Sequence, residues 1–322
     1  MTDDPHAASL AAITRADIAA AGARIAADIR HTPLLRVPGS VVGLNGIELW
    51  LKLEHLQVGG SFKARGMFNR MRANAVPAAG VVIASGGNAG IAVAVAAQAL
   101  GVRCEVFVPE TASPAKQARL RELGAVLSVG GASYADALAA SLERQAVTGA
   151  LLMHAYDQRE VVIGAGTLAA EVEADAGAVP DRVLVSVGGG GLVAGIAAWF
   201  GDRCRIDALE PELAPTLFRA REAGNPVDVA VSGIAADALG ARRIGAIAWE
   251  VTQRYVNAAH LLGDAAIRAA QRAMWQELRL AVEPAAALPL AALMSGVVVP
   301  ARGERVLLVV CGANLDLAAF AG

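Results

Sequence analysis

Short apolar runs alternate with longer segments of helical periodicity along most of the chain. The short runs predict buried strands, and apolar residues spaced three and four apart predict helices. The expected strands are residues 49–54, 81–84, 104–108, 125–129, 183–187, 205–209 and 305–310. The expected helices are residues 1–30, 64–74, 90–100, 114–123, 134–146, 161–173, 192–200, 215–223, 264–280 and 284–294.

This alternation is typical of βαβ units, in which a helix connects two parallel strands. We therefore predict an α/β fold with open, largely parallel twisted sheets flanked by helices. At 322 residues the chain is long enough for two domains. We predict a small βαβ domain of residues 72–150, inserted in a larger domain formed by residues 1–71 and 151–322. In the first expected helix, Thr14 and Asp17 have the spacing of a capping box.

The chain has few aromatic residues and little net charge. Hydrophobic residues make up 55% of the chain and aromatic residues 4%, which suits helices packed on parallel sheets. A net charge of -2 gives no basic surface for nucleic acid. Cys104, Cys204 and Cys311 are far apart and lack CxxC spacing, and Asp3 and Asp4 do not suit the basic start of a secretory signal. We expect a cytoplasmic protein without a disulfide framework or a zinc site.

Two stretches, residues 73–102 and 183–201, lack charged residues for long enough to cross a membrane. Each is interrupted by a glycine-rich segment, and alanine supplies much of the apolar character. Broken helices occur in transporters, but two interrupted stretches in an otherwise charged chain favour buried strand–loop–helix units. We therefore predict no membrane partner.

The first candidate for chemistry is a lysine in a glycine-rich turn, Gly59-Gly60-Ser61-Phe62-Lys63. Glycines let the backbone turn and approach a ligand closely. A lysine shielded from water behind Phe62 would have a lowered pKa and would be a candidate nucleophile or Schiff-base amine. Taken alone, the same turn is more typical of a solvated surface lysine.

Three further turns follow the carboxyl ends of expected strands, where open parallel sheets bind ligands. Residues 85–90, Ser-Gly-Gly-Asn-Ala-Gly, place backbone amides at a helix start, which suits an anion or a simple N-cap turn. Gly188 to Gly191 also precede a helix, and four consecutive glycines favour amides wrapped around a phosphate over a structural turn. Residues 311–314, Cys-Gly-Ala-Asn, by themselves indicate a turn with a buried thiol.

Other motifs are absent or incomplete. The chain contains no Walker A, G-x-S-x-G or HExxH sequence. Residues 164–169 match G-x-G-x-x-A, but no clear strand precedes them and no acidic residue follows at the distance of a ribose contact. The hypothesis of a nicotinamide-dependent oxidoreductase rests on this segment alone.

The order of these turns resembles that of the fold-type II (tryptophan synthase β-like) pyridoxal phosphate enzymes, and within them the serine/threonine dehydratases. The resemblance runs from residues 31–34, His-Thr-Pro-Leu, to Asn314. Residues 60–66 resemble the family's Schiff-base motif, and residues 186–191 resemble its phosphate loop. Residues 282–287, Val-Glu-Pro-Ala-Ala-Ala, resemble the start of the family's last major helix.

The resemblance implies roles for the groups around the cofactor, pyridoxal 5'-phosphate. Lys63 would hold it as a Schiff base and later remove the Cα proton, with Phe62 packed near the ring. Asn88 would hydrogen-bond the ring hydroxyl. Cys311 would face the pyridine nitrogen, and because a neutral thiol cannot keep that nitrogen protonated, β-elimination is favoured over transamination.

The resemblance also implies two anion sites built from backbone amides. The phosphate would be bound by Gly188, Gly189, Gly190 and Gly191. The substrate carboxylate would be bound by the amides of Ser85, Gly86, Gly87, Asn88 and Ala89.

Two departures from the family pattern bear on the reaction and on the cation that we expect. Serine racemases place a second serine at the position of Gly86, and glycine cannot transfer a proton, so racemisation is disfavoured. Residues 210–216 resemble the family's cation loop, but Thr216 stands where members that bind a divalent ion have a carboxylate. Glu210 and the Ala214 carbonyl remain candidate ligands for a monovalent (K+) or divalent cation, with an ordinary strand end as the alternative. The family also implies a homodimer.

We therefore predict a cytoplasmic pyridoxal phosphate-dependent lyase whose partner is a small amino acid substrate. It would convert L-serine, L-threonine or a related β-hydroxy amino acid to a 2-oxo acid and ammonia. One alternative is a β-replacement synthase of the same fold. Another is a non-catalytic protein that binds or senses pyridoxal phosphate.

Overall fold

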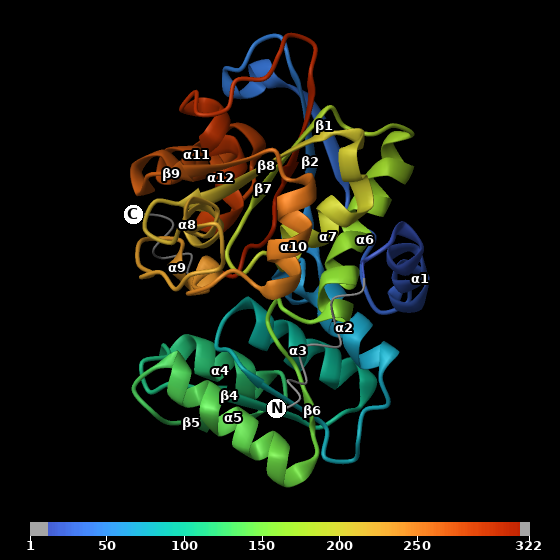
Figure 1. Cartoon of the computed structure of the whole chain (residues 1–322), viewed down its shortest axis with the longest axis vertical. Coiled ribbons are helices and arrows are strands. Elements are labelled where there is room, and N and C mark those ends of the chain that lie inside the picture. Colours follow the sequence, from blue (N-terminus) through green and yellow to red (C-terminus); the bar gives the residue numbers. More distant parts are fainter. Residues whose placement is uncertain (1–11, 316–322) are drawn as a thin grey trace.

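The computed structural model describes residues 12–315, which form two open sheets flanked by helices (Figure 1). The larger sheet has the strand order β1-β2-β10-β7-β8-β9, and the smaller sheet has the order β5-β4-β3-β6. Among the described strands, β1 and β2 pair antiparallel and all other pairs are parallel. The predicted α/β fold with largely parallel sheets is confirmed.

The larger sheet combines strands from both ends of the chain. Its strands are β1 (Leu34–Pro38), β2 (Glu48–Lys52), β7 (Arg182–Ser186), β8 (Arg205–Pro211), β9 (Ala258–Leu262) and β10 (Arg305–Val309). One face carries α11 (Asp264–Leu278) and α12 (Pro284–Met294), and the other carries α6 (Arg159–Ala176), α7 (Gly191–Phe200) and α10 (Ala246–Tyr255) (Figure 1). The same part of the molecule contains α1 (Arg15–Ile25), α8 (Thr216–Ala223), α9 (Ala236–Leu239) and 3-10 turns at Gly39–Val42, Glu54–Leu56, Val58–Gly60 and Gly201–Arg203.

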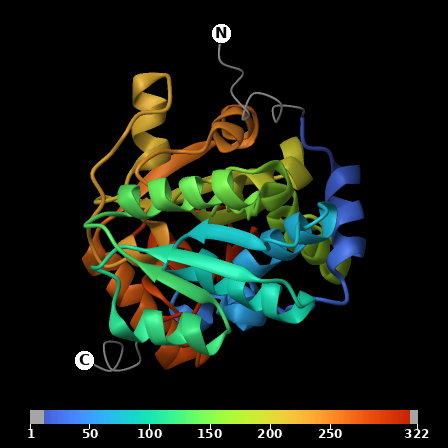
Figure 2. The ribbon, with the colours of Figure 1, turned by 90° about the horizontal axis from the view of Figure 1, so that it is seen from below.

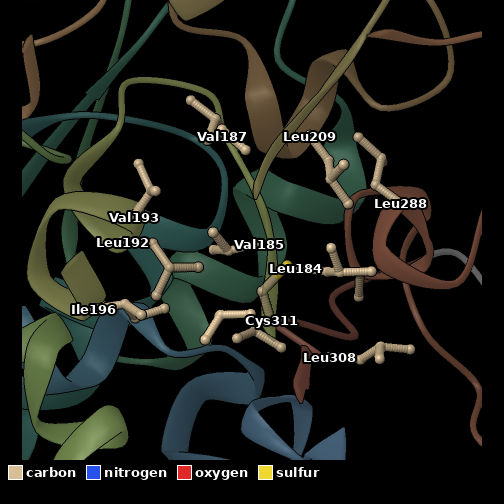
Figure 3. Close-up of a cluster of buried hydrophobic side chains, with 14 of the residues drawn as sticks. Leu184, Val185, Val187, Leu192, Val193, Ile196, Leu209, Leu288, Leu308 and Cys311 are labelled. Atoms are coloured by element: carbon tan, nitrogen blue, oxygen red, sulfur yellow. The ribbon is translucent and has the colours of Figure 1, made fainter. Parts of the chain in front are cut away.

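Aliphatic side chains fill the space between the larger sheet and its helices. Figure 3 shows Val185 of β7 on the side of Leu192 and Ile196 of α7. Leu184 and Leu308 lie on the opposite side of the strands, towards α12. Cys311, just after β10, lies in the same buried cluster. This rigid core therefore fixes the carboxyl ends of β7 and β10, where the candidate chemistry is located.

The smaller sheet contains β3 (Val81–Ala84), β4 (Cys104–Val108), β5 (Val126–Val129) and β6 (Leu151–Leu152). Figure 2 views the molecule from below, with this sheet towards the viewer. Helices α3 (Asn88–Leu100) and α4 (Pro114–Glu122) pack on one face and α5 (Tyr134–Thr148) packs on the other. Helix α2 (Lys63–Ala73) packs against both α6 and α3 and so connects the two sheets. We propose that the smaller sheet and its helices form a separate domain. Because β6 (Leu151–Leu152) belongs to this sheet, the domain would end slightly after the predicted boundary at residue 150.

Most predicted elements occur close to their expected bounds. Thr14 caps α1 and exchanges hydrogen bonds with Asp17, as the capping box predicts. Residues 1–11 of the first expected helix lie outside the described residues. The sequence interpretation missed β1, β6, β9, α9 and α10. Strand β9, Ala-Ala-His-Leu-Leu, lacks the β-branched and aromatic residues that mark strands. Within residues 12–315, no helix has the length and apolar character needed to cross a membrane.

Candidate active site

Lys63 begins α2, and its amine lies in a small buried cavity. Its Nζ donates a hydrogen bond to the carbonyl oxygen of Ala155 at 2.6 Å. The preceding turn is attached to the end of β10, because the Phe62 amide donates to the Cys311 carbonyl at 3.1 Å. Gly60 has a φ of 76°, a conformation that favours glycine. The turn therefore places the lysine beside the last strand of the larger sheet.

Burial changes the acid–base properties of Lys63. Loss of hydration lowers the pKa of Lys63 from 10.5 to about 8, against the opposing charges of Cys311 and Glu283. Burial also raises the pKa of the Cys311 thiol well above 9, so that thiol is neutral at pH 7 and only Glu283 then favours the charged amine. With a pKa of about 8, roughly a tenth of the Lys63 amine is unprotonated at pH 7, and the unprotonated form is the one that acts as a nucleophile or base.

The cavity around Lys63 brings together groups that are far apart in the sequence. Its predicted members are Phe62, Lys63, Asn88, Gly188, Gly189, Gly190, Gly191 and Cys311, all of which line it. Ser85, Gly86, Gly87 and Ala89 lie beside Asn88, between the end of β3 and the first turn of α3. The cavity measures about 40 Å³, which is smaller than the ~300–1,000 Å³ typical of ligand clefts.

The tetraglycine, residues 188–191, joins β7 to α7 without a side-chain cap on the helix. Gly190 has a φ of 87°. A β-carbon at Gly189 would lie 2.3 Å from the ring of Tyr156, and one at Gly191 would lie 2.8 Å from the Tyr156 carbonyl oxygen. Glycine is therefore required at these positions, and the first amides of α7 remain available to an anion.

The asparagine loop, residues 85–90, forms a second helix start without a side-chain cap. Gly87 is the N-cap of α3 and offers no side-chain hydrogen bond to the first amides of the helix. A β-carbon at Gly90 would lie 1.9 Å from the Ser85 carbonyl oxygen, so the loop closes tightly only with glycine there. These amides are suited to a carboxylate for the same reasons of geometry and dipole.

Glu283 is a site residue that the sequence interpretation did not identify as one. It lines the cavity, is 4% exposed, and accepts hydrogen bonds from the Asn88 side-chain amide at 2.9 and 3.0 Å. Burial raises the pKa of Glu283 from 4.5 to about 7, although the Asn88 hydrogen bonds oppose the shift. Because it immediately precedes Pro284 of α12, the sequence signal was that of a helix start. Tyr156 was likewise missed, since an isolated tyrosine after a short strand carries no motif.

Of the candidate cation ligands, Glu210 lies near the end of β8 and Ala214 lies just before α8. The Glu210 carboxylate is buried and accepts hydrogen bonds from the Leu217 and Phe218 amides at 2.7 Å each and from the Thr216 hydroxyl at 2.9 Å. Burial raises the pKa of Glu210 to about 7. Both carboxylate oxygens thus stabilise the helix start, and a cation would have to share them. Within the described residues, no group of three or more His, Cys, Asp or Glu side chains is arranged to hold a metal ion.

The G-x-G-x-x-A segment, residues 164–169, lies inside α6 and does not follow a strand. A β-carbon at Gly164 would lie 2.5 Å from the Arg65 carbonyl oxygen, and one at Gly166 would lie 2.7 Å from that of Gly195. These glycines allow close packing of α6 against α2 and α7. They do not form the phosphate turn that the nicotinamide hypothesis needs.

Comparison with known proteins gives consistent matches over most of the chain. Residues 25–312 match the family described as "Pyridoxal-phosphate dependent enzyme". A phenylserine dehydratase from Ralstonia pickettii is 36% identical, with 94% of each chain covered. The structure of a threonine deaminase from T.th. is 34% identical, with a TM-score of 0.87 over 94% of this chain and 99% of that one. Maize serine racemase is 29% identical, with a TM-score of 0.89 over 97% of this chain and 96% of that one.

Proposed function

Because the chain belongs to the pyridoxal-phosphate dependent enzyme family and is a lyase of that family, we propose that it is an ammonia-lyase acting on a β-hydroxy amino acid. The substrate would be L-serine, L-threonine or a related compound, and the products a 2-oxo acid and ammonia. The related proteins compared above are named for phenylserine, threonine and serine, which carry different groups on Cβ. Their names therefore do not specify the group on Cβ of this protein's substrate.

The residues around Lys63 fit the cofactor. The tetraglycine offers uncapped amides and no β-carbons to a phosphate, Asn88 offers an amide to a ring hydroxyl, and Cys311 offers a neutral thiol to a ring nitrogen. When bound, pyridoxal phosphate supplies an electron sink for the Cα carbanion. The neutral thiol limits that sink, which favours loss of a β-substituent over transamination.

The proposed reaction assigns proton removal and substrate orientation to this chain. Lys63, with a pKa of about 8, anchors the cofactor and then removes the proton from Cα. The amides of the loop before α3 orient the substrate by its carboxylate. Gly86, on that loop, has no group to return a proton to the opposite face of Cα. We therefore propose elimination and not racemisation, although serine racemases share the fold.

One observation carries this proposal: a single buried amine with a lowered pKa shares a cavity with the tetraglycine and Asn88. Replacing Lys63→Ala should reduce ammonia release from serine or threonine by about 10³-fold or more. It should also abolish the absorbance band of the lysine-linked cofactor. Lys116→Ala, on α4, is the matched lysine control and should keep that band. Full activity of the Lys63 variant would disprove the assignment.

The β-replacement alternative is separated by its product. Wild-type protein supplied with serine and excess sulfide should still release ammonia and a 2-oxo acid. Accumulation of a new amino acid in place of ammonia would favour a synthase. An absorbance band without turnover of any β-hydroxy amino acid would favour the non-catalytic alternative.

A further inference from the structure

A second cavity, of about 210 Å³, lies on the α5 side of the smaller sheet. Tyr134, Leu138 and Leu142 line it and are spaced four residues apart, so they form a stripe on one face of α5. Leu152 and Met153, at the end of the sheet, provide the opposite apolar wall. The exposed fractions of Tyr134 and Leu142 leave the mouth of the cavity open to solvent.

This cavity adjoins both groups that would hold the substrate. Its wall includes Ala84, the residue directly before the loop proposed to bind the carboxylate. Its wall also includes Ala155, whose carbonyl oxygen accepts the hydrogen bond from Lys63 Nζ at 2.6 Å. The segment of residues 154–158 separates the two cavities, with Tyr156 facing the first and its neighbours facing the second. A substrate with its carboxylate at the loop and its Cα at Lys63 would therefore have only this segment between Cβ and the second cavity.

We propose that this cavity receives the β-substituent, and that the preferred substrates are β-hydroxy amino acids with an aryl or bulky aliphatic group on Cβ. The inference rests on the proposed function and names its substrate class. The hydroxymethyl group of serine and the added methyl of threonine would leave most of the cavity unfilled.

Size supports an aryl group. An apolar cavity of about 150 Å³ lined by aliphatic and aromatic side chains is large enough to bind benzene. The cavity here is somewhat larger, at about 210 Å³, and its wall includes three leucines, a methionine and a tyrosine. Burial of a phenyl ring against such a wall is favourable in proportion to the area removed from water.

Charge disfavours an acidic substituent. Within residues 12–315, the wall of this cavity includes no Lys or Arg, and its one carboxylate belongs to Asp157. Asp157 accepts hydrogen bonds from the amides of Ala246 and Ile247 at 2.9 and 3.1 Å, at the start of α10. Gln158 is engaged with the His154 amide and the Leu152 carbonyl. His154 also lines the cavity, and its Nδ1 accepts hydrogen bonds from the Tyr156 and Asp157 amides at 3.3 and 2.9 Å. A second carboxylate on the substrate would therefore meet the Asp157 carboxylate and no Lys or Arg side chain in this wall.

The reaction balances without an additional reagent. From 3-phenylserine, the Cα–H and Cβ–O bonds break and one water leaves. The resulting enamine takes a proton at Cβ, and hydrolysis of the imine consumes one water and gives phenylpyruvate and ammonia. The net change is the same as for serine.

The test compares specificity constants of the holoenzyme. The kcat/KM for 3-phenylserine should exceed that for L-serine by at least about tenfold. Leu138→Trp, which fills the cavity from α5, should reduce the ratio of the two constants by at least about tenfold. Val147→Trp lies on the same helix, is 76% exposed and does not line the cavity, so it should leave the ratio unchanged. Equal loss on both substrates in the Leu138 variant would overturn the inference.

A binding measurement separates this inference from the proposed function. L-phenylalanine and L-alanine lack the β-hydroxyl and cannot undergo the elimination, so calorimetry reports their binding to the holoenzyme alone. L-phenylalanine should bind at least about tenfold more tightly, and Leu138→Trp should remove that preference. Serine turnover with no preference for the phenyl group would overturn the inference alone. Preference for phenylalanine with no turnover of any β-hydroxy amino acid would overturn the proposed function alone.

Discussion

The side-chain amide of Asn88 donates to both carboxylate oxygens of Glu283, at 2.9 and 3.0 Å. The carbonyl oxygen of the same Asn88 side chain accepts a hydrogen bond from Asn314 at 2.8 Å. These contacts join the start of α3 to the start of α12, beside Lys63. A buried carboxyl thus orients the asparagine that we propose to contact the cofactor ring.

Glu283 should make the stability of the fold decrease as pH rises. Its pKa is about 7 in the folded protein and 4.5 as the ordinary value, so the folded state binds the extra proton between these limits. Stability from this group is present below about pH 4.5 and is lost as pH rises through about 7. Glu283→Gln mimics the protonated acid, and its free energy of unfolding relative to wild type should rise by about 3 kcal/mol across that window.

Urea unfolding at several pH values, with both proteins in the same cofactor state, measures this difference. Glu122→Gln is the matched control, because Glu122 forms an exposed pair with Arg119 on α4. The control should show no comparable pH-dependent difference. A constant difference between wild type and the Glu283 variant across the window would contradict the buried, protonated acid.

Gly189→Ala should weaken cofactor binding through Tyr156. The added β-carbon would lie 2.3 Å from the Tyr156 ring, so the ring or the loop has to move, at a cost of about 1–3 kcal/mol. Cofactor titration should show at least about tenfold weaker binding, since about 1.4 kcal/mol corresponds to tenfold. Gly130→Ala meets no atom within 4 Å and serves as the control. If Gly189→Ala with Tyr156→Ala does not recover binding, the collision with the ring is not the cause.

Arg65→Met should destabilise the protein strongly. Arg65, two residues after Lys63, is fully buried and donates to Glu54 twice at 2.7 Å and to Glu171 at 2.7 and 2.8 Å. Removing the guanidinium leaves the buried Glu54 carboxylate without its charged partner, at a cost of about 3–5 kcal/mol in urea unfolding. Arg119→Met breaks an exposed pair and should cost about 0–1 kcal/mol. Similar losses in both variants would show that the buried network contributes little.

Periodicity predicted much of the fold because the central strands are buried on both faces. The run at residues 81–84 and the helix of residues 284–294 were placed at or near their observed bounds. The missed elements lack such a signal: β1 and β9 are only partly buried, and β6 has two residues. Pairing with neighbouring strands, which sequence periodicity does not report, determines them.

The candidate site likewise contains residues that the sequence identified and residues that it did not. Lys63 and the tetraglycine were identified from sequence because glycine runs are costly unless a close backbone approach needs them. Glu283 was not, since an acid before Pro284 is typical of an N-cap, yet its side chain makes no cap hydrogen bond and faces Asn88 instead. Contacts between residues nearly two hundred positions apart depend on how the two sheets pack, which no local pattern encodes.

Gly86→Ser tests why the proposed reaction uses one face of Cα. A β-carbon at Gly86 would lie 3.3 Å from a methyl of Val108 and 3.9 Å from Ala112, so a serine fits after a small shift. Its hydroxyl would introduce a proton donor on the loop beside the proposed carboxylate site. Because a positioned acid or base contributes about 10²–10⁴-fold, the variant should form D-serine from L-serine at least about tenfold faster than wild type. Chiral chromatography measures this, and Gly86→Ala, which adds the carbon without the hydroxyl, should show no gain. Equal D-serine formation by wild type and both variants would mean that Gly86 does not limit the chemistry to one face.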